Sequence, residues 1–414
     1  MSGYAIGSPH LPVPRQSILG IWSLDSRQTQ LLVWPVLMGA FGYALLQYHY
    51  SFLAQDFFAL WSYGRLLRDH AASEIYDPIR LHALQVGLGM DPDWDAPFPY
   101  PPIFLLLVWP LGLLPLRLAY HVWIGLGLAA FLWAATGPRL RPLTAALLAA
   151  LPASSVCISA GQSGFLTGAL LLGGLRLAVA RPWLGGLLLG VLTFKPQLGL
   201  MVPVALAAAG AWRAFGAAAA VTAALSALTL LAFGPGAWVD WLTTLPGYQS
   251  RFDLNLGNLH LQPTVTANLA MAGVPAGATR AVQVLVAAVM AALVWMSCRR
   301  GLSRTAVAVA AAATAAANPH AFFYDLPMLT AAALFLGQSR VQAGGRLHWA
   351  ETALLLLVIC LPAVMLWVDL PVSLPVVLPF ALWAGWQGLQ AAKTWPGRQA
   401  VANCNSASRA YSPP

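Results

Sequence analysis

The chain has 414 residues, of which 59% are hydrophobic and only 8% are charged. Soluble domains average about 45–50% apolar and about 25% charged residues, so these charges are too few to cover a water-facing surface. The composition argues against a water-soluble enzyme, a disordered scaffold and a nucleic-acid-binding protein. The net charge of +9 does not change this, because the basic residues lie singly or in pairs between apolar runs. The sequence predicts an integral membrane protein.

Twelve apolar runs are candidate membrane spans, because a spanning helix needs roughly 20 mostly apolar residues. The first run begins only after residue 29, which argues against a cleaved signal peptide. We expect a single all-α transmembrane domain over residues 1–414, a bundle of about twelve helices. The candidate spans are 30–48, 101–116, 118–136, 143–158, 164–180, 183–203, 213–233, 281–298, 305–319, 322–338, 350–368 and 372–392.

Two long polar segments, 49–100 and 234–280, are expected to be the first and second outer loops, on one face of the bundle. Together they could form a roof over a cavity at one membrane surface. The first loop holds seven of the thirteen acidic residues: Asp56, Asp69, Glu74, Asp77, Asp91, Asp93 and Asp95.

The basic residues favour a cytoplasmic N-terminus, because cytoplasmic loops carry an excess of Lys and Arg. The cytoplasmic side then receives Arg15, Arg27, Arg117, Arg213, Arg299, Arg300, Arg304, Arg340, Arg346, Lys393, Arg398 and Arg409. The outer side receives Arg65, Arg68, Arg80, Arg139, Arg141, Arg181, Arg251 and Arg280. Arg139, Arg141 and Arg181 break the rule. Either the helices between 139 and 181 do not all cross, or these arginines bind an anionic ligand.

The sequence predicts neither a disulfide framework nor a metal centre. Cys157, Cys298, Cys360 and Cys404 lie far apart and without zinc-site spacing, so they are interpreted as small apolar residues. His49 and the acidic run 91–95 suggest a cation site, but a solvated turn is the commoner meaning of such a run.

Residues 55–67 predict an interfacial amphipathic helix directly after the first span, with Phe57, Leu60, Trp61 and Leu67 on one face. Asp56 stands at the start of this helix. There an aspartate is a favoured N-cap that also complements the helix dipole. A carboxylate at the membrane surface is equally suited to catalysis, and both interpretations stay open.

Further motifs follow Asp56-Phe57-x-x-x-Trp61 in a fixed order. They are Tyr76-Asp77, Tyr100-Pro101-Pro102, Gly161-Gln162, Phe194-Lys195-Pro196-Gln197 and Asn318-Pro319-His320. This ordered set, spread over about residues 50–330, resembles glycosyltransferase family 87, whose members are polytopic GT-C enzymes that use polyprenyl-phosphate sugars. The resemblance implies a GT-C-like bundle. One feature departs from it, since Gly161-Gln162 falls on the inner face of the twelve-span topology.

The resemblance implies transfer of a mannose- or arabinofuranose-like sugar from a polyprenyl-phosphate donor to a lipid or glycan acceptor. The active site would face the outer, periplasmic side of a bacterial-type inner membrane, among membrane lipids. No nucleic acid and no cofactor is expected, although a divalent cation stays open. The acceptor hydroxyl must lose a proton, and Asp56 is the candidate general base. A single displacement with one base inverts the anomeric configuration.

Lys195 is the first candidate for the donor phosphate, because a lysine inside an apolar run is costly and usually functional. The alternative is a structural role, by snorkelling or by pairing with a carbonyl beside Pro196. The other candidates for the donor phosphate or sugar are His320, Gln162 and Tyr324. For His320 the alternative is a histidine satisfied by its neighbours. The candidates for an acceptor or sugar pocket are Asn258, His260 and Tyr100.

Two other functions stay open on the sequence. A multi-pass transporter or lipid flippase without transferase activity would place ionisable residues near the bilayer midplane, on discontinuous helices. Here only Lys195 is expected to be that deep, and no internal repeat stands out. The other possibility is a catalytically inactive relative that serves as an assembly partner.

Overall fold

The computed structural model describes residues 55–137, 142–254, 256–342 and 346–394. Within these ranges every regular element is helical, as expected. The expected span 30–48 lies outside the described residues. The α-helices are α2 (Gln55–Leu66), α3 (Ala72–Tyr76), α4 (Pro78–Gly87), α5 (Ile103–Val108), α6 (Leu116–Thr136), α7 (Pro142–Ala150), α8 (Pro152–Ala160), α9 (Gly164–Leu177), α10 (Pro182–Val191), α11 (Val202–Ala208), α12 (Trp212–Phe233), α13 (Gly236–Leu254), α14 (Val265–Met271), α15 (Ala276–Cys298), α16 (Arg304–Ala317), α17 (Pro327–Gln342), α18 (Trp349–Trp367) and α19 (Leu374–Thr394). The 3-10 helices are η1 (Leu111–Leu113), η2 (Leu192–Phe194), η3 (Pro196–Gly199), η4 (Leu256–Leu261) and η5 (Phe323–Asp325).

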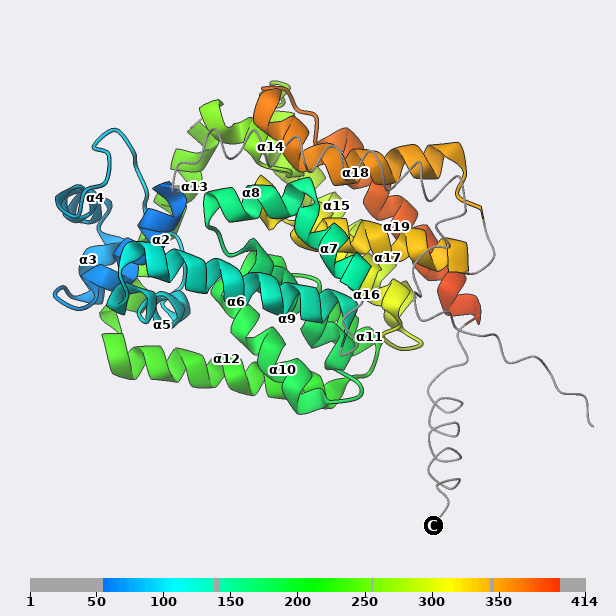
Figure 1. Cartoon of the computed structure of the whole chain (residues 1–414), viewed down its shortest axis with the longest axis horizontal. Helices are drawn as coiled ribbons and strands as arrows, with labels where there is room; N and C mark the ends of the chain where they lie inside the picture. Colours follow the sequence, from blue (N-terminus) through cyan, green and yellow to red (C-terminus); the bar gives the residue numbers. More distant parts are fainter. Residues whose placement is uncertain (1–54, 138–141, 255, 343–345, 395–414) are drawn as a thin grey trace, which may run out of the picture.

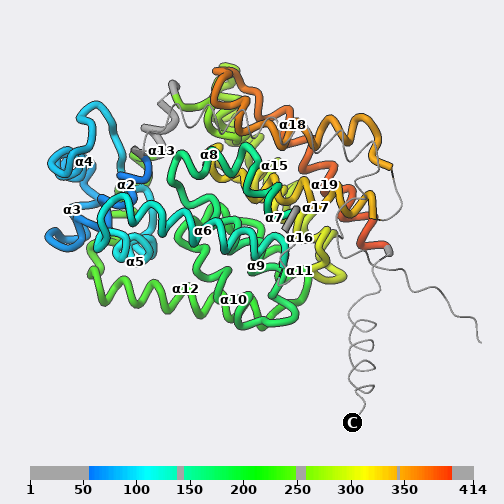
Figure 2. The backbone as a smooth tube through the Cα atoms, viewed as in Figure 1, coloured from blue at the N-terminus to red at the C-terminus, as the bar shows by residue number. Residues whose placement is uncertain are grey.

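The helices form an elongated bundle, and the first part of the described chain gathers at one end of it (Figures 1 and 2). In both views α2, α3, α4 and α5 lie at the left, whereas α6 and α12 run along the bundle from there. We call the end that carries residues 55–114 the α2 end. This arrangement lets segments distant in sequence meet at one place.

Within the described part of the chain, four helices are long and apolar enough to cross a membrane: α6, α12, α15 and α18, with 21, 22, 23 and 19 residues. They match the expected spans 118–136, 213–233, 281–298 and 350–368. Leu231 of α12 is 86% exposed, which suits a lipid-facing helix. Spans 164–180, 305–319, 322–338 and 372–392 correspond to α9, α16, α17 and α19, and span 143–158 is divided at Pro152 into α7 and α8. The structure thus gives a helical membrane protein without confirming twelve crossings.

The expected span 101–116 is wrong, because this segment folds back against α2. Trp61 Nε1 donates to Leu114 O at 2.9 Å, and Tyr63 Oη donates to Pro97 O at 2.9 Å. The chain just before the segment and the end of the segment therefore both lie against the same short helix. A Cβ on Gly64 would clash with a backbone carbonyl of α5, so glycine is required for this close approach. Apolar character favoured a span, but α5 has only six residues, about 9 Å of helix in a bilayer core about 30 Å thick.

The expected span 183–203 is also wrong as one crossing, because the chain turns back at Lys195–Pro196. Gly186 of α10 packs against α12 near Ala217, and Gly190 packs near Val221, so α10 and α12 run in parallel. The intervening chain must therefore return to the end where α10 began. The helix stops where Lys195 adopts φ −126° and ψ 74° before Pro196, as expected of a residue that precedes proline.

These two corrections change the end of the bundle to which some basic residues belong. Since the segment before α6 does not cross, Arg117 lies at the α2 end and Arg181, beyond the end of α9, lies at the opposite end. The C-terminal ends of α6 and α9 lie together, because the guanidinium of Arg176 in α9 donates to Ala134 O in α6. Arg181 thereby joins Arg213, Arg299, Arg300, Arg304, Arg340 and Lys393 at one end. Arg139 and Arg141 lie outside the described residues.

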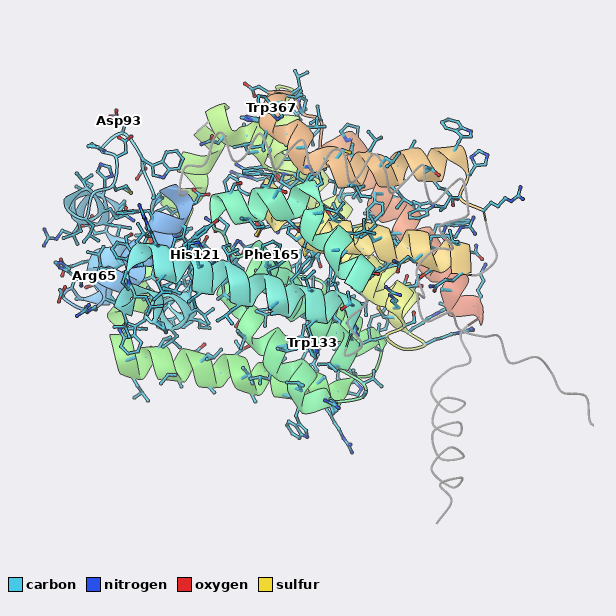
Figure 3. All side chains as sticks on the ribbon, in the orientation of Figure 1. Arg65, Asp93, His121, Trp133, Phe165 and Trp367 are labelled. Atoms are coloured by element: carbon cyan, nitrogen blue, oxygen red, sulfur yellow. The ribbon has the colours of Figure 1, made fainter. Side chains whose placement is uncertain are left out.

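Acidic residues gather at the α2 end instead. Figure 3 labels Asp93 and Arg65 there, on the loop and helix that form this end. Asp240 and Asp325, from later elements, lie near this end, since they interact electrostatically with Tyr76 and Tyr100 respectively. Glu351 at the start of α18 pairs with Arg340 instead. The two ends therefore differ in charge, as the two sides of a membrane protein are expected to do.

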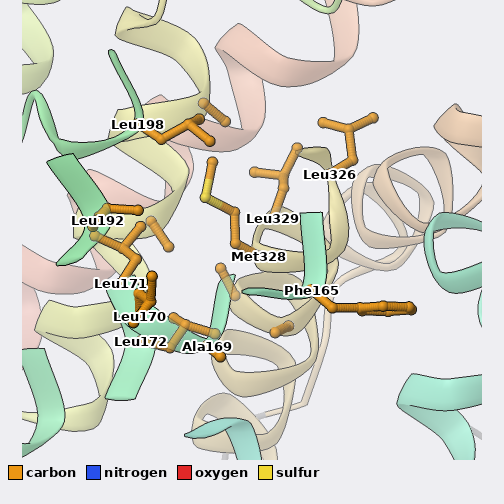
Figure 4. Packing of buried hydrophobic residues seen from close by; sticks show 14 of the residues in the cluster. Phe165, Ala169, Leu170, Leu171, Leu172, Leu192, Leu198, Leu326, Met328 and Leu329 are labelled. Atoms are coloured by element: carbon orange, nitrogen blue, oxygen red, sulfur yellow. The ribbon is translucent and has the colours of Figure 1, made fainter. Parts of the chain in front are cut away.

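The core beneath the α2 end is a continuous apolar cluster (Figure 4). The turn at Lys195–Pro196 between α10 and α11 is called the hairpin tip. Leu192 and Leu198, on either side of it, pack in the same cluster as Leu326 and Met328, which follow η5. The alanine-rich helix α16 is buried from Ala306 to Ala317. This packing fixes the hairpin tip and the segment before α17 against each other.

Candidate functional site

Asp56 lies in the first turn of α2, which begins at Gln55, so it does not occupy the N-cap position that the sequence allowed. The expected apolar face of α2 exists, but it packs on protein: Phe57 and Leu60 are each 1% exposed, and the Phe57 ring meets the Tyr120 ring edge-on at 5.4 Å. Asp56 is thereby held half-buried at the rim of the core.

Burial has a clear electrostatic consequence for Asp56. Removal of water from the carboxylate raises its pKa from 3.8 to about 6. A hydrogen bond from the Gln162 side chain and the positive charge of Lys195 oppose this rise, in that order of size. A carboxylate with a pKa near 6 is still ionised at neutral pH but is a stronger base than an exposed aspartate.

Gln162 reaches Asp56 from the turn between α8 and α9. Gly161 ends α8 with φ +62°, and a Cβ there would clash with Phe57, so only glycine fits this turn. Sequence reasoning placed Gly161-Gln162 on the opposite face from Asp56, which is wrong because the segment 101–116 does not cross. Gln162 is 7% exposed and its Oε1 atom has no hydrogen-bond partner.

Lys195 sits at the tip of the α10–α11 hairpin, buried from solvent. Its Nζ atom lies 2.9 Å from Asp325 Oδ1, and the two side chains are 4% and 5% exposed. The same ammonium lies 5.3 Å from the centroid of the Tyr324 ring and 5.9 Å from that of Tyr100, within the range of cation–π attraction. Lys195 therefore does not snorkel but is held among one carboxylate and two rings.

The structure thus brings together Asp56, Gln162, Lys195, Tyr100 and Tyr324 from five separate segments, and adds Asp325. Sequence reasoning assigned no role to Asp325. A signal for it existed, because a lysine buried in an apolar run needs a counter-charge and the chain has only thirteen acidic residues.

The remaining candidates lie further from this group. His320 packs its ring on Phe322 at 5.4 Å, and Phe322 stacks on Tyr324 at 5.3 Å. His260 Nδ1 lies 3.3 Å from Asp369 Oδ1, and Asn258 is exposed on η4. Within the described part of the chain, neither residue of η4 forms a hydrogen bond or ion pair with Asp56 or Lys195.

No metal centre is apparent in the described residues, where no group of three His, Cys, Asp or Glu side chains could hold an ion. The acidic run 91–95 forms an exposed turn in which Asp93 N donates to Asp91 Oδ1 at 3.0 Å. Cys157, Cys298 and Cys360 are free thiols. Cys404 and His49 lie outside the described residues.

The fold and site define a polytopic helical membrane protein whose few buried charges converge at one end of the bundle. A model of glycosyltransferase family 87 matches residues 98–319, more than half of the chain. The chain belongs to glycosyltransferase family 87 and is therefore a glycosyltransferase. The match includes Tyr100, Gln162 and Lys195, and it ends before Tyr324. No curated protein and no solved structure matches the chain.

Proposed function

We propose that this glycosyltransferase moves a mannose- or arabinofuranose-like sugar from a polyprenyl-phosphate donor to a hydroxyl of a lipid or glycan acceptor. The observation that carries the proposal is the group formed by the half-buried Asp56 and the buried Gln162, Lys195 and Asp325. It supplies a carboxylate base and a cation in one site, which transfer from a phosphate carrier requires.

Asp56 is the proposed general base. The acceptor hydroxyl attacks the anomeric carbon and passes its proton to the Asp56 carboxylate, while the bond from that carbon to the phosphate oxygen breaks. The phosphate carries away the bonding electron pair as a stable anion and needs no acid. A pKa of about 6 suits this role, because general bases work best when their pKa lies near the operating pH. One displacement inverts the anomeric centre.

Lys195 is the proposed partner of the leaving phosphate. A fixed ammonium in a water-poor site stabilises developing negative charge more strongly than one in water. Gln162 is proposed to orient Asp56, and the Tyr100 and Tyr324 rings to enclose the ammonium and the sugar. His320, separated from Tyr324 by the Phe322 ring, is proposed to assist at the donor. His260 and Asn258 are proposed for the wider acceptor pocket.

We propose that the α2 end faces the periplasm and that the opposite end faces the cytoplasm of a bacterial-type inner membrane. The support is the arginine-rich composition of the opposite end, which matches the rule for cytoplasmic loops. The donor lipid would then reach Asp56 and Lys195 from the outer leaflet.

The direct test is transfer by the purified protein in detergent or nanodiscs, with polyprenyl-phosphate mannose and polyprenyl-phosphate arabinofuranose offered separately, together with a lipid extract as acceptor. We expect a glycosylated lipid product with one of these donors and none with nucleotide sugars. Product from nucleotide sugars alone would refute the proposed donor class.

A further inference from the structure

Two carboxylates and one ammonium share the buried site, and only one pair of them is in contact. Lys195 Nζ forms its ion pair with Asp325 Oδ1 at 2.9 Å. Asp56, in contrast, accepts a hydrogen bond from Gln162 and interacts with Lys195 only electrostatically. The ammonium therefore interacts with both carboxylates but forms its ion pair with Asp325.

This division has an energetic basis. A buried charge without a partner is costly, and removal of one member of a buried pair leaves the other uncompensated. If Asp325 were neutral, Asp56, whose carboxylate already interacts electrostatically with Lys195, would be available as its partner. An ion pair between them would lower the basicity of Asp56 and occupy the cation at the same time.

Asp325 is itself held in place. Its second oxygen, Oδ2, accepts a hydrogen bond from Phe322 N at 3.3 Å, which closes the turn of η5. The next residue, Leu326, is 2% exposed in the apolar core. Asp325 thus accepts a hydrogen bond from the backbone of its own turn with one oxygen and pairs with Lys195 through the other.

We propose that Asp325 is a positioning residue that keeps the Lys195 ammonium from pairing with Asp56, so that base and cation act separately. The separate catalytic roles of Asp56 and Lys195 rest on the proposed function, but the electrostatic coupling among the three charges does not depend on it. It predicts a specific coupling among Asp56, Lys195 and Asp325 that a merely structural Asp325 would not produce.

Other titratable groups face the three charges. They are the phenols of Tyr63, Tyr100 and Tyr324 and the thiol of Cys157. Phenols and thiols ordinarily titrate near 10 and 8.5. Between pH 5 and 8 these phenols and this thiol are therefore uncharged, so they add no charge to that of Asp56, Lys195 and Asp325.

The first test is a double-mutant cycle read by thermal unfolding in detergent at pH 8, without any substrate. In the parent protein, Asp56→Asn removes a desolvated carboxylate, so the Tm should rise. In Asp325→Asn, where Asp56 has become the partner of Lys195, the same Asp56→Asn substitution should lower the Tm. An effect of the same sign and size in both backgrounds would overturn the proposal.

The second test is the pH dependence of turnover in Asp325→Asn. The acid limb of the rate profile should move down by about one pH unit, because an opposite charge in contact lowers a carboxylate pKa by about 1–3 units, and Asp325→Glu should restore it. An acid limb that stays in place while the rate falls would assign Asp325 a structural role only.

A variant that removes both members of the Lys195–Asp325 pair covers the case in which Asp325→Asn fails to fold. In the doubly neutral Lys195→Met/Asp325→Asn protein, Asp56→Asn should again raise the Tm, as in the parent. A lowered Tm there would refute the role of Lys195 in the coupling. The unfolding cycle needs no transfer activity, so failure of the proposed sugar donor would not be confused with failure of this inference.

Discussion

Asp56→Asn separates catalysis from stability in this enzyme. Asparagine has a similar shape and can still hydrogen-bond Gln162, but it cannot accept the proton of an acceptor hydroxyl. Loss of a general base typically costs roughly 10²–10⁴-fold in rate. We therefore expect kcat to fall by about that factor while the protein remains folded.

The same substitution should stabilise the protein at neutral and alkaline pH. The pKa of Asp56 is raised from 3.8 to about 6 by burial, and one pKa unit corresponds to about 1.4 kcal/mol. The ionised carboxylate therefore costs the folded state up to about 3 kcal/mol relative to the unfolded chain. Because the folded-state pKa is the higher one, this cost is absent below pH 3.8, grows as the pH rises and is complete above pH 6.

The assays are donor-dependent sugar transfer and thermal unfolding, each followed from pH 4.5 to 8.5. The parent rate should fall as the pH drops below about 6, and the stability gain of Asp56→Asn should fade over the same interval. Asp69→Asn is the matched control, since Asp69 belongs to the same acidic loop but is 64% exposed and pairs only with Arg65. Full transfer activity in folded Asp56→Asn protein would refute the base assignment, and a stability gain independent of pH would refute the electrostatic reasoning.

Three other substitutions test the site and the fold. Lys195→Met should lower kcat at least 10²-fold, because removal of one preorganised stabilising group typically costs that much; retained turnover in a single-round assay would exclude its phosphate role. Gln162→Leu should move the acid limb of the rate profile above pH 6, because a hydrogen bond that lowers the pKa of Asp56 is lost; an unchanged limb would contradict the contact. Gly64→Ala should lower the Tm strongly through a clash with α5, whereas Gly87→Ala, with open space around it, should leave the Tm nearly unchanged.

Much of the architecture followed from the sequence, because apolar length alone identifies a membrane helix. The spans at α6, α12, α15 and α18 were predicted within a few residues. The errors fell where apolar runs contain proline, namely at 101–116, at Pro152 and at Lys195–Pro196. Hydropathy counts apolar residues but does not report whether the chain continues or turns back, and that depends on packing between distant segments.

In the candidate site, too, single residues were predictable from the sequence but their mutual arrangement was not. Asp56, Gln162 and Lys195 were predicted from residue type and motif order, and the structure brings them together. Their mutual placement was not predictable, because the topology expected from the sequence put Gln162 at the wrong end. The partner of Lys195 was missed, since residues 195 and 325 are 130 positions apart and no local pattern connects them.

The broken segments and the site have a common physical origin. Irregular backbone at membrane depth is tolerated only where protein or water satisfies its polar groups, and a buried ammonium is tolerated only beside a counter-charge. The hairpin tip meets both conditions at once, because the turn that interrupts the helix presents Lys195 to Asp325 inside the protein. A continuous span through 183–203 would leave this lysine facing lipid or another helix. The proline after Lys195 thus allows the turn that places this charge beside Asp325.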